Sequence, residues 1–312
     1  MILAVSLNPA LDVTHHVAGV DWSGVNRPQQ VTAAPGGKAL NVARTLRALG
    51  TGVRVIGLAG GVTGAAVRAG LAAAGVPGAF TPIAGETRRT FAVVDTSSHD
   101  TALFNEPGPP VAAGEYQEFL VLYENSLAGC DAVVLSGSLP PGLPEDSYAG
   151  LTARAAAAAV PVVLDAGGAA LRRGAAAGPA IAKPNLVELQ AAVRRPLADR
   201  AAVAAAAAEL RAEGAGAVVV SLGGDGLLAV TGTGTWHAAP PAQAAGNPTG
   251  AGDAVVAGLA HGLVLGWPWA EVLRHAAALG TASVAAPAAG QFAEADYQRA
   301  LAGTQVTEWA DG

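Results

Sequence analysis

The stretch AGNPTGAGDAVVAGLAHGL, residues 245–263, places three small residues directly before an acid and an apolar run. Residues 250–252 lead into Asp253, and the residues that follow are compatible with a helix. A dinucleotide-binding fingerprint would need glycine where Val255 stands, and a P-loop would need lysine directly after the glycines. The stretch fits neither pattern. It predicts a helix that starts from nearly bare backbone, where amide groups and the helix dipole favour an anion.

Two interpretations of this helix start remain open on the stretch alone. In the first, residues 250–252 form a tight turn and Asp253 stabilises the first turn of the helix. In the second, the amides of residues 250–253 bind a phosphoryl group in transfer, while Asp253 takes a proton from the attacking hydroxyl. Other stretches of the chain bear on this choice.

The composition limits the class of protein. The chain has 312 residues, enough for one large α/β domain or two smaller ones. Its longest uncharged apolar run, 254–270, is interrupted by glycine, histidine and proline, so no membrane-spanning helix is expected. The net charge of −6, without a basic run, argues against a nucleic-acid partner. Cys130 is alone, and the N-terminal residues carry no secretion signal, which predicts a cytoplasmic location.

Short apolar runs alternate with helical patterns along most of the chain. Such near-continuous apolar runs are typical of parallel strands that are covered on both faces. The expected strands are 2–7, 53–58, 132–135, 162–164, 180–182 and 218–222, and the expected helices are 37–49, 64–74, 114–127, 145–159, 186–195 and 199–212. Residues 226–230 and 235–238 are expected to add antiparallel strands. This order predicts an α/β fold with a doubly wound, mostly parallel sheet.

Two segments depart from this alternation. Residues 12–34 and 90–105 resemble β-hairpins with polar turns, and neither is followed by a crossover helix. We expect them to form one small sheet that projects from the main body as a lid or an association surface. No repeat and no long linker divides the chain. We therefore expect a single domain over 1–312, with a lid formed by about 12–34 and 86–106.

A second glycine pair precedes a helix in APGGKALNVARTLRALG, residues 34–50. Lys38 and Asn41 fall in the first turns of that helix, on about one face. A lysine opposes the helix dipole at this position, so stability alone does not favour it. The segment is either a glycine turn with a solvated lysine, or a site where Asn41 contacts sugar hydroxyls and Lys38 meets an anion.

Three further stretches have both a structural and a functional interpretation. In KPNLVEL, residues 183–189, Asn185 and Glu188 have the spacing of a capping box. The same two side chains could order the water shell of Mg²⁺, which keeps most of its waters in proteins. SLGGDGLLAV, residues 221–230, is either a turn between strands or a bare surface for a nucleotide. SGSLPPG, residues 136–142, follows a strand, where open α/β sheets bind ligands.

Together these stretches resemble the ribokinase and phosphofructokinase-B family of sugar kinases. PGGKALNVA is similar to the first signature of the family, NPTGAGDAVVAG to its second, and KPNLVEL to its magnesium motif. The motifs follow the order of the family from residue 1 to about 290. LNPALD, GVNR, GGK, GETR, NEPGP and SGSLPPG resemble the branch that acts on phosphorylated ketohexoses. That branch contains 1-phosphofructokinases and tagatose-6-phosphate kinases.

The resemblance assigns a role to each matching position. It implies that Asp253 is the catalytic base and that Gly250, Ala251 and Gly252 form the anion hole. It implies substrate contacts by Asp12, Arg27, Gly37, Lys38, Asn41, Arg88 and Ser138, with Arg27, Lys38 and Arg88 near the substrate phosphate. It implies a nucleotide and magnesium side formed by Lys183, Asn185, Glu188, Ser221 and Gly223, where Asn185 and Glu188 act on Mg²⁺ through water.

Four positions depart from the pattern of the family, and Ala39, in place of the usual glycine after GGK, and Ala254, in place of the usual small hydroxyl residue after the base, are two of them. Thr90 stands where the branch usually has asparagine, two residues after the arginine of GETR. Asn247 stands where many ribokinases carry an aspartate linked to a monovalent cation, so no potassium site is predicted.

The resemblance implies an ATP-dependent kinase that converts fructose 1-phosphate to fructose 1,6-bisphosphate, with Mg²⁺ and with dimers formed through the lid. Tagatose 6-phosphate and fructose 6-phosphate are alternative substrates. A sugar-phosphate sensor without turnover is an alternative of another class, but a sensor would have no use for Asp253. A nucleoside or ribose kinase would not need Arg27, Lys38 and Arg88.

Overall fold

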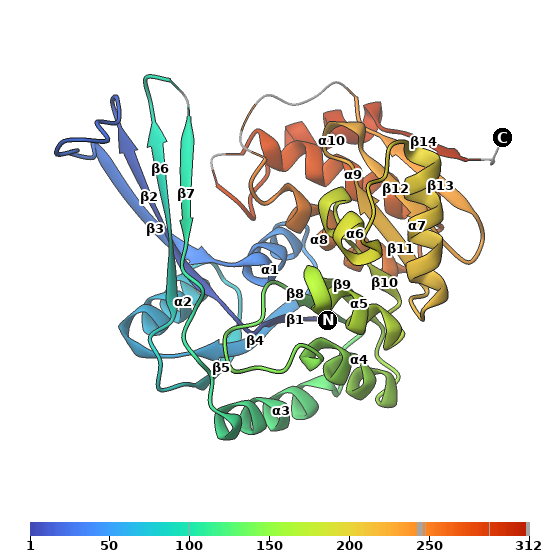
Figure 1. The fold of residues 1–312 in the computed structure, drawn as a ribbon, viewed down its shortest axis with the longest axis horizontal. Coiled ribbons are helices and arrows are strands. Elements are labelled where there is room, and N and C mark those ends of the chain that lie inside the picture. The colour runs from blue at the N-terminus through green and yellow to red at the C-terminus, as the bar shows by residue number, and fades with distance from the viewer. Residues whose placement is uncertain (99, 242–245, 247, 287, 310–312) are drawn as a thin grey trace.

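A computed structural model gives the fold and describes residues 1–98, 100–241, 246, 248–286 and 288–309 (Figure 1). Within these residues, one large sheet is sandwiched between two layers of helices, and a small second sheet projects from one side. The small sheet is formed by the two hairpin segments that the sequence predicts to project from the main body. The α/β fold class, with a mostly parallel main sheet and a small separate sheet, is confirmed.

The large sheet has the strand order β14-β13-β12-β11-β10-β9-β8-β1-β4-β5. Strand β1 pairs in parallel with β4 and β8, and the parallel pairing extends to β5 on one side and to β11 on the other. The last three strands are antiparallel. The bounds are β1 (Ile2–Ser6), β4 (Val53–Ala59), β5 (Gly78–Pro82), β8 (Ala132–Ser136), β9 (Val162–Asp165), β10 (Ile181–Ala182), β11 (Ala217–Ser221), β12 (Leu227–Val230), β13 (Thr235–Ala239) and β14 (Gln305–Glu308).

Helices bury both faces of this sheet. In β1, Ile2 and Ala4 pack into the apolar cluster on one face, and Leu3 and Val5 pack into the cluster on the other. This alternation explains why the strands have no polar face. One face is covered by α1 (Lys38–Ala48), α2 (Gly61–Ala73), α8 (Ala251–Leu265) and α9 (Trp269–Val284). The other is covered by α3 (Ala113–Leu127), α4 (Ser147–Ala157), α5 (Gly168–Ala176), α6 (Leu186–Val193) and α7 (Arg200–Ala212). Helix α10 (Glu294–Gly303) packs against α9.

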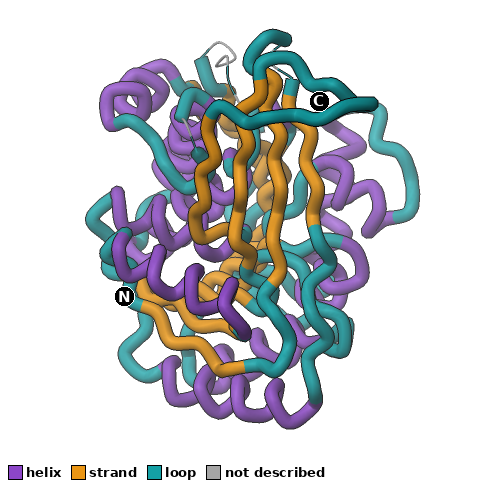
Figure 2. The backbone as a smooth tube through the Cα atoms, turned by 90° about the vertical axis from the view of Figure 1, so that its left-hand side faces the viewer, coloured by secondary structure: helices purple, strands orange, loops and turns teal. Residues whose placement is uncertain are grey.

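The lid sheet has the order β3-β2-β6-β7, and its strands lie side by side in Figure 2. Strands β2 and β3 pair antiparallel, β2 and β6 parallel, and β6 and β7 antiparallel. Two hairpins that are far apart in sequence therefore join into one sheet, as expected from the sequence. The bounds are β2 (Ala10–Val17), β3 (Gln30–Gly36), β6 (Arg88–Asp95) and β7 (Thr101–Asn105).

Several elements were not predicted from the sequence. The strand β5 has glycine and proline at its ends, and the helix α5 is rich in glycine and alanine, so neither has a clear periodicity. Helix α2 begins at Gly61, before the predicted start at residue 64. Among the described helices, none combines the length and the hydropathy that a membrane span requires. The organisation as a single domain with a lid over 12–34 and 86–106 stays a prediction.

Candidate active site

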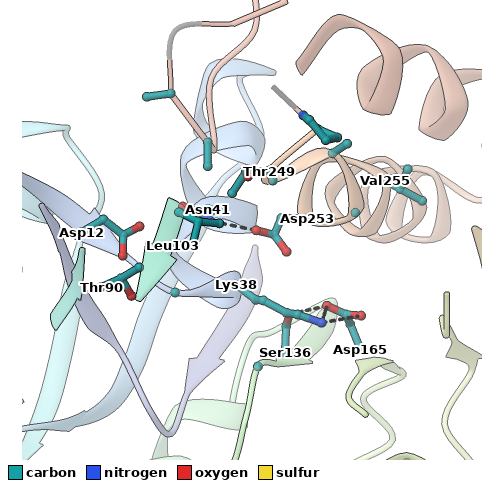
Figure 3. A pocket seen from close by; sticks show the side chains of 18 of the residues that line it. Asp12, Lys38, Asn41, Thr90, Leu103, Ser136, Asp165, Thr249, Asp253 and Val255 are labelled. Atoms are coloured by element: carbon teal, nitrogen blue, oxygen red, sulfur yellow. Dashed lines mark hydrogen bonds and ion pairs between the residues drawn. The ribbon is translucent and has the colours of Figure 1, made fainter. Parts of the chain in front are cut away.

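A cleft lies between the inner face of the lid and the carboxyl ends of the parallel strands (Figure 3). Its volume is about 1240 Å³, whereas single ligands usually occupy sites of about 300–1,000 Å³. The cleft therefore has room for two ligands. The residues predicted from the sequence that line it are Asp12, Gly37, Lys38, Asn41, Arg88, Ser138, Lys183, Asn185, Ser221, Gly223, Gly250, Ala251, Gly252 and Asp253.

The carboxylate of Asp253 lies in the first turn of α8, near the middle of the cleft. It is only 6% exposed, and its Oδ2 accepts a hydrogen bond of 2.7 Å from Asn41 Nδ2 (Figure 3). Burial, together with the negative charge of Asp165, raises the pKa of Asp253 to about 7, although Asn41 and two lysines act in the opposite direction. A carboxylate with a pKa near neutral is suited to accept a proton during a reaction.

The loop before α8 supports this placement. Gly250 has a φ of 89°, and a Cβ there would lie 2.6 Å from the Cβ of Ala289, so both conformation and packing favour glycine. The amide of Ala251 donates to the carbonyl of Pro248 at 3.1 Å, so this amide is engaged within the turn. A Cβ on Gly252 would lie 3.7 Å from Lys183 Nζ, which places an ammonium group beside the helix start. The anion hole stays a prediction, with Lys183 as a neighbour.

Asp165, at the end of β9, joins two lysines at the bottom of the cleft. Its Oδ1 lies 3.1 Å from Lys183 Nζ, and its Oδ2 lies 3.4 Å from Lys38 Nζ and accepts a hydrogen bond of 2.9 Å from Ser136 Oγ. Burial opposes ionisation of Asp165, but Lys183, Lys38 and Ser136 hold its pKa below the usual value. Burial likewise opposes the charge on Lys38, but Asp165 and other nearby carboxylates raise its pKa. The two ammonium groups are therefore fixed close to Asp253.

Asn185 and Glu188 form the capping box predicted for α6. The Glu188 amide donates to Asn185 Oδ1 at 2.8 Å, and the Asn185 amide donates to Glu188 Oε2 at 2.8 Å. The remaining oxygen, Glu188 Oε1, lies 3.6 Å from Lys38 Nζ. Within the described part of the chain, no three acidic, histidine or cysteine side chains form a group that could hold a metal directly. The donor set fits an ion that keeps its own waters, as Mg²⁺ does.

The lid side of the cleft contains a second charged group. Arg88 Nε donates to the carbonyl of Asn8 and its Nη1 to the carbonyl of Glu106, each at 3.2 Å. Asn8 Nδ2 in turn donates to Ser138 Oγ at 3.0 Å, so Arg88 and Ser138 lie at the same end of the cleft. Burial raises the pKa of Asp12 on β2, although a hydrogen bond with Thr90 opposes that effect.

The glycine-rich stretch after β11 forms the turn that the sequence suggests. Residues Gly223–Asp225 form a short 3₁₀ helix before β12, and Gly223 and Ser221 line the cleft. Asn185 forms an isolated parallel bridge with Ser221, so this turn adjoins the start of α6. The turn offers backbone, with few side chains, to a flat ligand.

The sequence model of the pfkB family of carbohydrate kinases matches residues 7–296 of this chain. The chain belongs to the pfkB family. A 1-phosphofructokinase from Rhodobacter capsulatus is 39% identical over 278 residues, which cover 89% of this chain and 88% of that protein. One from Xanthomonas campestris pv. campestris is 39% identical over 266 residues, covering 84% of each. The structure of phosphofructokinase-2 from Escherichia coli in complex with fructose-6-phosphate superimposes with a TM-score of 0.88 at 30% identity, covering 96% of this chain and 98% of that one.

In this pfkB kinase the three cations assigned to the substrate phosphate do not converge. Arg88 lines the cleft beside Ser138, whereas the ammonium of Lys38 is paired with Asp165 and Glu188. Arg27 is exposed on the β2–β3 connection and is not among the described residues that line the cleft. Glu188 is not among them either, but its Oε1 lies 3.6 Å from the Nζ of Lys38, which does line the cleft. Asn247, the position linked to monovalent cations, lies outside the described residues.

Sequence reasoning missed some residues that the structure of this kinase places in its site. Asp165 directly follows the apolar run of β9, so the rule that ligands bind at carboxyl ends of parallel strands could have indicated it. Ser136 at the end of β8 has the same signal. Asn8 has no local signal, because its partners are far away in sequence, and of the two partners of Arg44 only Asn41 is local while the Ala289 carbonyl is distant.

Proposed function

We propose that this protein transfers the γ-phosphoryl group of ATP to the 6-hydroxyl of fructose 1-phosphate, giving fructose 1,6-bisphosphate and ADP. Two relatives at 39% identity, named 1-phosphofructokinase, support this substrate. The similarity to phosphofructokinase-2 at 30% identity keeps fructose 6-phosphate as an alternative, and tagatose 6-phosphate is another.

The position of Asp253 is the observation that carries the proposal. Its carboxylate accepts a hydrogen bond from Asn41 and lies near enough to Lys38 and Lys183 for their charges to act on it, and Asp12 and Arg88 of the lid line the same cleft. A sugar hydroxyl that approaches from the lid would meet Asp253, and a phosphoryl group bound beside the lysines would lie opposite it.

The reaction forms one P–O bond and breaks another. The substrate hydroxyl oxygen attacks the γ-phosphorus, its proton passes to Asp253, and the bond to the β-phosphate oxygen breaks to release ADP. Charge spreads over the transferring phosphoryl oxygens, so fixed cations stabilise the transition state. Lys38 and Lys183 are placed for this role because Asp165 orients both ammonium groups. The backbone at the start of α8 adds its dipole.

Mg²⁺ is part of the proposal as the ion that neutralises charge on the ATP phosphates. Glu188 and Asn185 would hold its waters. The two hydrogen bonds of the capping box use neither Glu188 Oε1 nor the side-chain nitrogen of Asn185, so these two atoms could face the ion. The flat turn at Gly223 would receive the nucleotide base.

The substrate phosphate would bind at the Arg88 end of the cleft. Two backbone carbonyls hold Arg88 and orient its guanidinium, and no carboxylate within the described part of the chain forms a salt bridge with it. Ser138 adds a hydroxyl at the same end. Charge-assisted contacts of this kind suit a phosphate.

A homodimer through the lid and a cytoplasmic location belong to the same proposal. The lid exposes apolar side chains on several elements, namely Trp22, Val25, Val31, Leu103 and Phe104. A second copy packed against the lid would bury them. It would also explain Arg27, which could contact the substrate phosphate in the cleft of the other copy.

The test measures ADP release with fructose 1-phosphate, fructose 6-phosphate, tagatose 6-phosphate and free fructose. We expect the highest kcat/KM for fructose 1-phosphate. Arg88→Ala should lower this value by roughly 10–150-fold, because a charge-assisted contact contributes about 1.5–3 kcal/mol, while KM for ATP stays near the wild-type value. Arg68→Ala, an arginine on the outer side of α2, is the matched control. A higher kcat/KM for another sugar would reject the substrate assignment, and equal losses on fructose would reject Arg88 as a phosphate contact.

A further inference from the structure

Arg44 is a partly buried cation in the cleft to which the proposed mechanism gives no role. It lies on α1, one turn after Asn41. Its Nη2 donates to Asn41 Oδ1 at 2.6 Å and to the carbonyl of Ala289 at 2.7 Å. Its Nε is buried without a hydrogen-bond partner among the described residues. Such a costly arrangement suggests a function, because burial of an arginine away from a full set of partners is unfavourable.

The bond from Arg44 determines which way the Asn41 amide faces. A guanidinium has only donors, so Asn41 must present its oxygen to Arg44. The NH₂ group of Asn41 is then left to face Asp253, where Nδ2 donates to Oδ2 at 2.7 Å (Figure 3). If the amide turned over, its oxygen would face the carboxylate. Two acceptors can share a hydrogen bond only if the carboxyl group carries a proton, and a protonated carboxyl group cannot accept one from the substrate.

Packing around residues 288–290 holds Arg44 in place. A Cβ on Gly290 would lie 2.9 Å from Arg44 Nε and 3.0 Å from the Cα of Asn41, so this segment covers both side chains closely. Ala289 also lies against Gly250 at the start of α8. The same segment therefore contacts α1 and the loop that leads to Asp253, and Arg44 bonds to its backbone.

We propose that Arg44 is a positioning residue for phosphoryl transfer: it fixes the Asn41 amide so that its NH₂ group keeps Asp253 an ionised proton acceptor. This inference rests on the proposed role of Asp253 as the base. Arg44 touches no reacting atom in this assignment and acts through Asn41.

The groups around Asp253 determine whether loss of Arg44 should raise or lower the pKa of this carboxyl group. Asp165 at the end of β9 disfavours its ionisation, while Lys38 on α1 and Lys183 after β10 favour it, as does the Asn41 NH₂ group. Arg44 faces both Asp253 and Asp12 of the lid. Loss of Arg44 removes the constraint on the amide. The pKa of Asp253 should therefore rise, and the base should be ionised only at higher pH.

The test titrates Asp253 directly in Arg44→Met, which keeps the apolar stem but has no donor. The carboxylic-acid infrared band of Asp253 is identified by its absence from Asp253→Asn. We expect its midpoint to rise by about one pH unit, the effect of losing about one hydrogen bond to the ionised form. The acidic limb of kcat/KM should move in parallel. Arg47→Met is the matched control on the same helix, because Arg47 is exposed and donates to the Gly75 carbonyl, away from the cleft; it should leave both unchanged.

Repeating Arg44→Met in a protein that already carries Asn41→Leu distinguishes an effect through the Asn41 amide from a direct effect of the Arg44 charge on Asp253. In Asn41→Leu, which has no amide, Arg44→Met should produce no further rise if Arg44 acts through Asn41. An equal rise in that background, or no rise in the wild-type background, would overturn the proposal. If Arg44→Met does not fold, Arg44→Lys takes its place with a smaller rise of the same sign expected. The infrared titration needs no substrate, so a wrong sugar assignment would leave its result unaffected.

Discussion

The raised pKa that suits Asp253 to accept a proton also makes the stability of the folded protein depend on pH. Burial and Asp165 raise its pKa to about 7 in the folded protein, well above the value of about 3.9 for an unfolded chain. Between these values the folded state binds a proton that the unfolded state has lost. Stability from this group is therefore complete below about pH 4 and is lost as the pH rises through about 7.

Asp253→Asn should remove both the activity and this pH dependence. Turnover should fall by roughly 10²–10⁴, the usual contribution of a general base. The amide oxygen introduced by the substitution could still accept from Asn41, so we expect the melting temperature of the variant, relative to wild type, to be higher at pH 8 than at pH 5. Thermal melts at both pH values and kcat measure the two effects, with the exposed Glu118→Gln as control. Retention of more than about a tenth of the activity would exclude Asp253 as the base.

Individual residues also show which parts of the site can be predicted from the sequence. Asp253 and the pair Asn185 and Glu188 are detectable because each belongs to a local pattern at a helix start. The contacts of Asp165 with Lys38 and Lys183 depend on three separate strand and helix ends that meet in the fold. Local spacing contains no information on such distances, so the sequence alone does not predict that the Lys38 ammonium lies 3.4 Å from Asp165 Oδ2.

Glu188 at the start of helix α6 closes the capping box and is proposed to contact the waters of Mg²⁺. The substitution Glu188→Gln can separate these two roles. Glutamine also closes a capping box, so the stability of the helix should hardly change. The change removes the charge beside Lys38 and the proposed contact to magnesium waters. We expect the Mg²⁺ concentration for half-maximal activity to rise about 10-fold or more, which is typical for outer-shell partners, with an almost unchanged melting temperature.

Glu115→Gln provides the matched control for that experiment. Glu115 is the acidic residue in the first turn of α3, where it accepts from the amides of Ala112 and Ala84, and it is not among the described residues that line the cleft. Its replacement should leave the Mg²⁺ requirement unchanged. If Glu188→Gln also leaves it unchanged, Glu188 has only the capping role.

Elements with strong periodicity were predictable, and elements that depend on tertiary contacts were not. The central parallel strands are mostly apolar on both faces because helices cover both faces, and this pattern is visible in the sequence. Strand β5 lies at the edge of the sheet, with Gly78 and Pro82 at its ends, and it is stabilised by pairing with β4. Pairing with a partner distant in sequence can override a low intrinsic preference for the strand conformation.

At the scale of the whole molecule, the cleft depends on two sheets that meet only in the fold. The lid supplies Asp12 and Arg88, and the main body supplies the base and the lysines. The free end of the lid, with the β2–β3 connection, extends away from the body. Arg27 lies on this connection, so within one chain it has no place in the cleft described here.

The lid should therefore hold two chains together, and we expect the wild-type protein to sediment as a dimer. Leu103 and Phe104 are 48% and 52% exposed on neighbouring positions of β7, so their side chains point to opposite faces of the lid. Replacing both with glutamate should produce monomers, whichever face forms the contact. Val121→Glu combined with Leu265→Glu, exposed positions on α3 and α8, is the control and should remain dimeric. A monomeric wild type would reject the dimer.

Mixing two variants with different defects then tests whether Arg27 acts across the dimer. Arg27→Ala should lower kcat/KM for the sugar phosphate, and Asp253→Asn should abolish turnover. In a mixed dimer, one cleft receives Asp253 from the first variant and Arg27 from the second, and so is intact. Since half of randomly formed dimers are mixed and each has one intact cleft, equal mixing after dissociation and reassociation should restore about a quarter of the wild-type activity. No recovery would place Arg27 in its own cleft, and full activity of Arg27→Ala alone would remove Arg27 from the site.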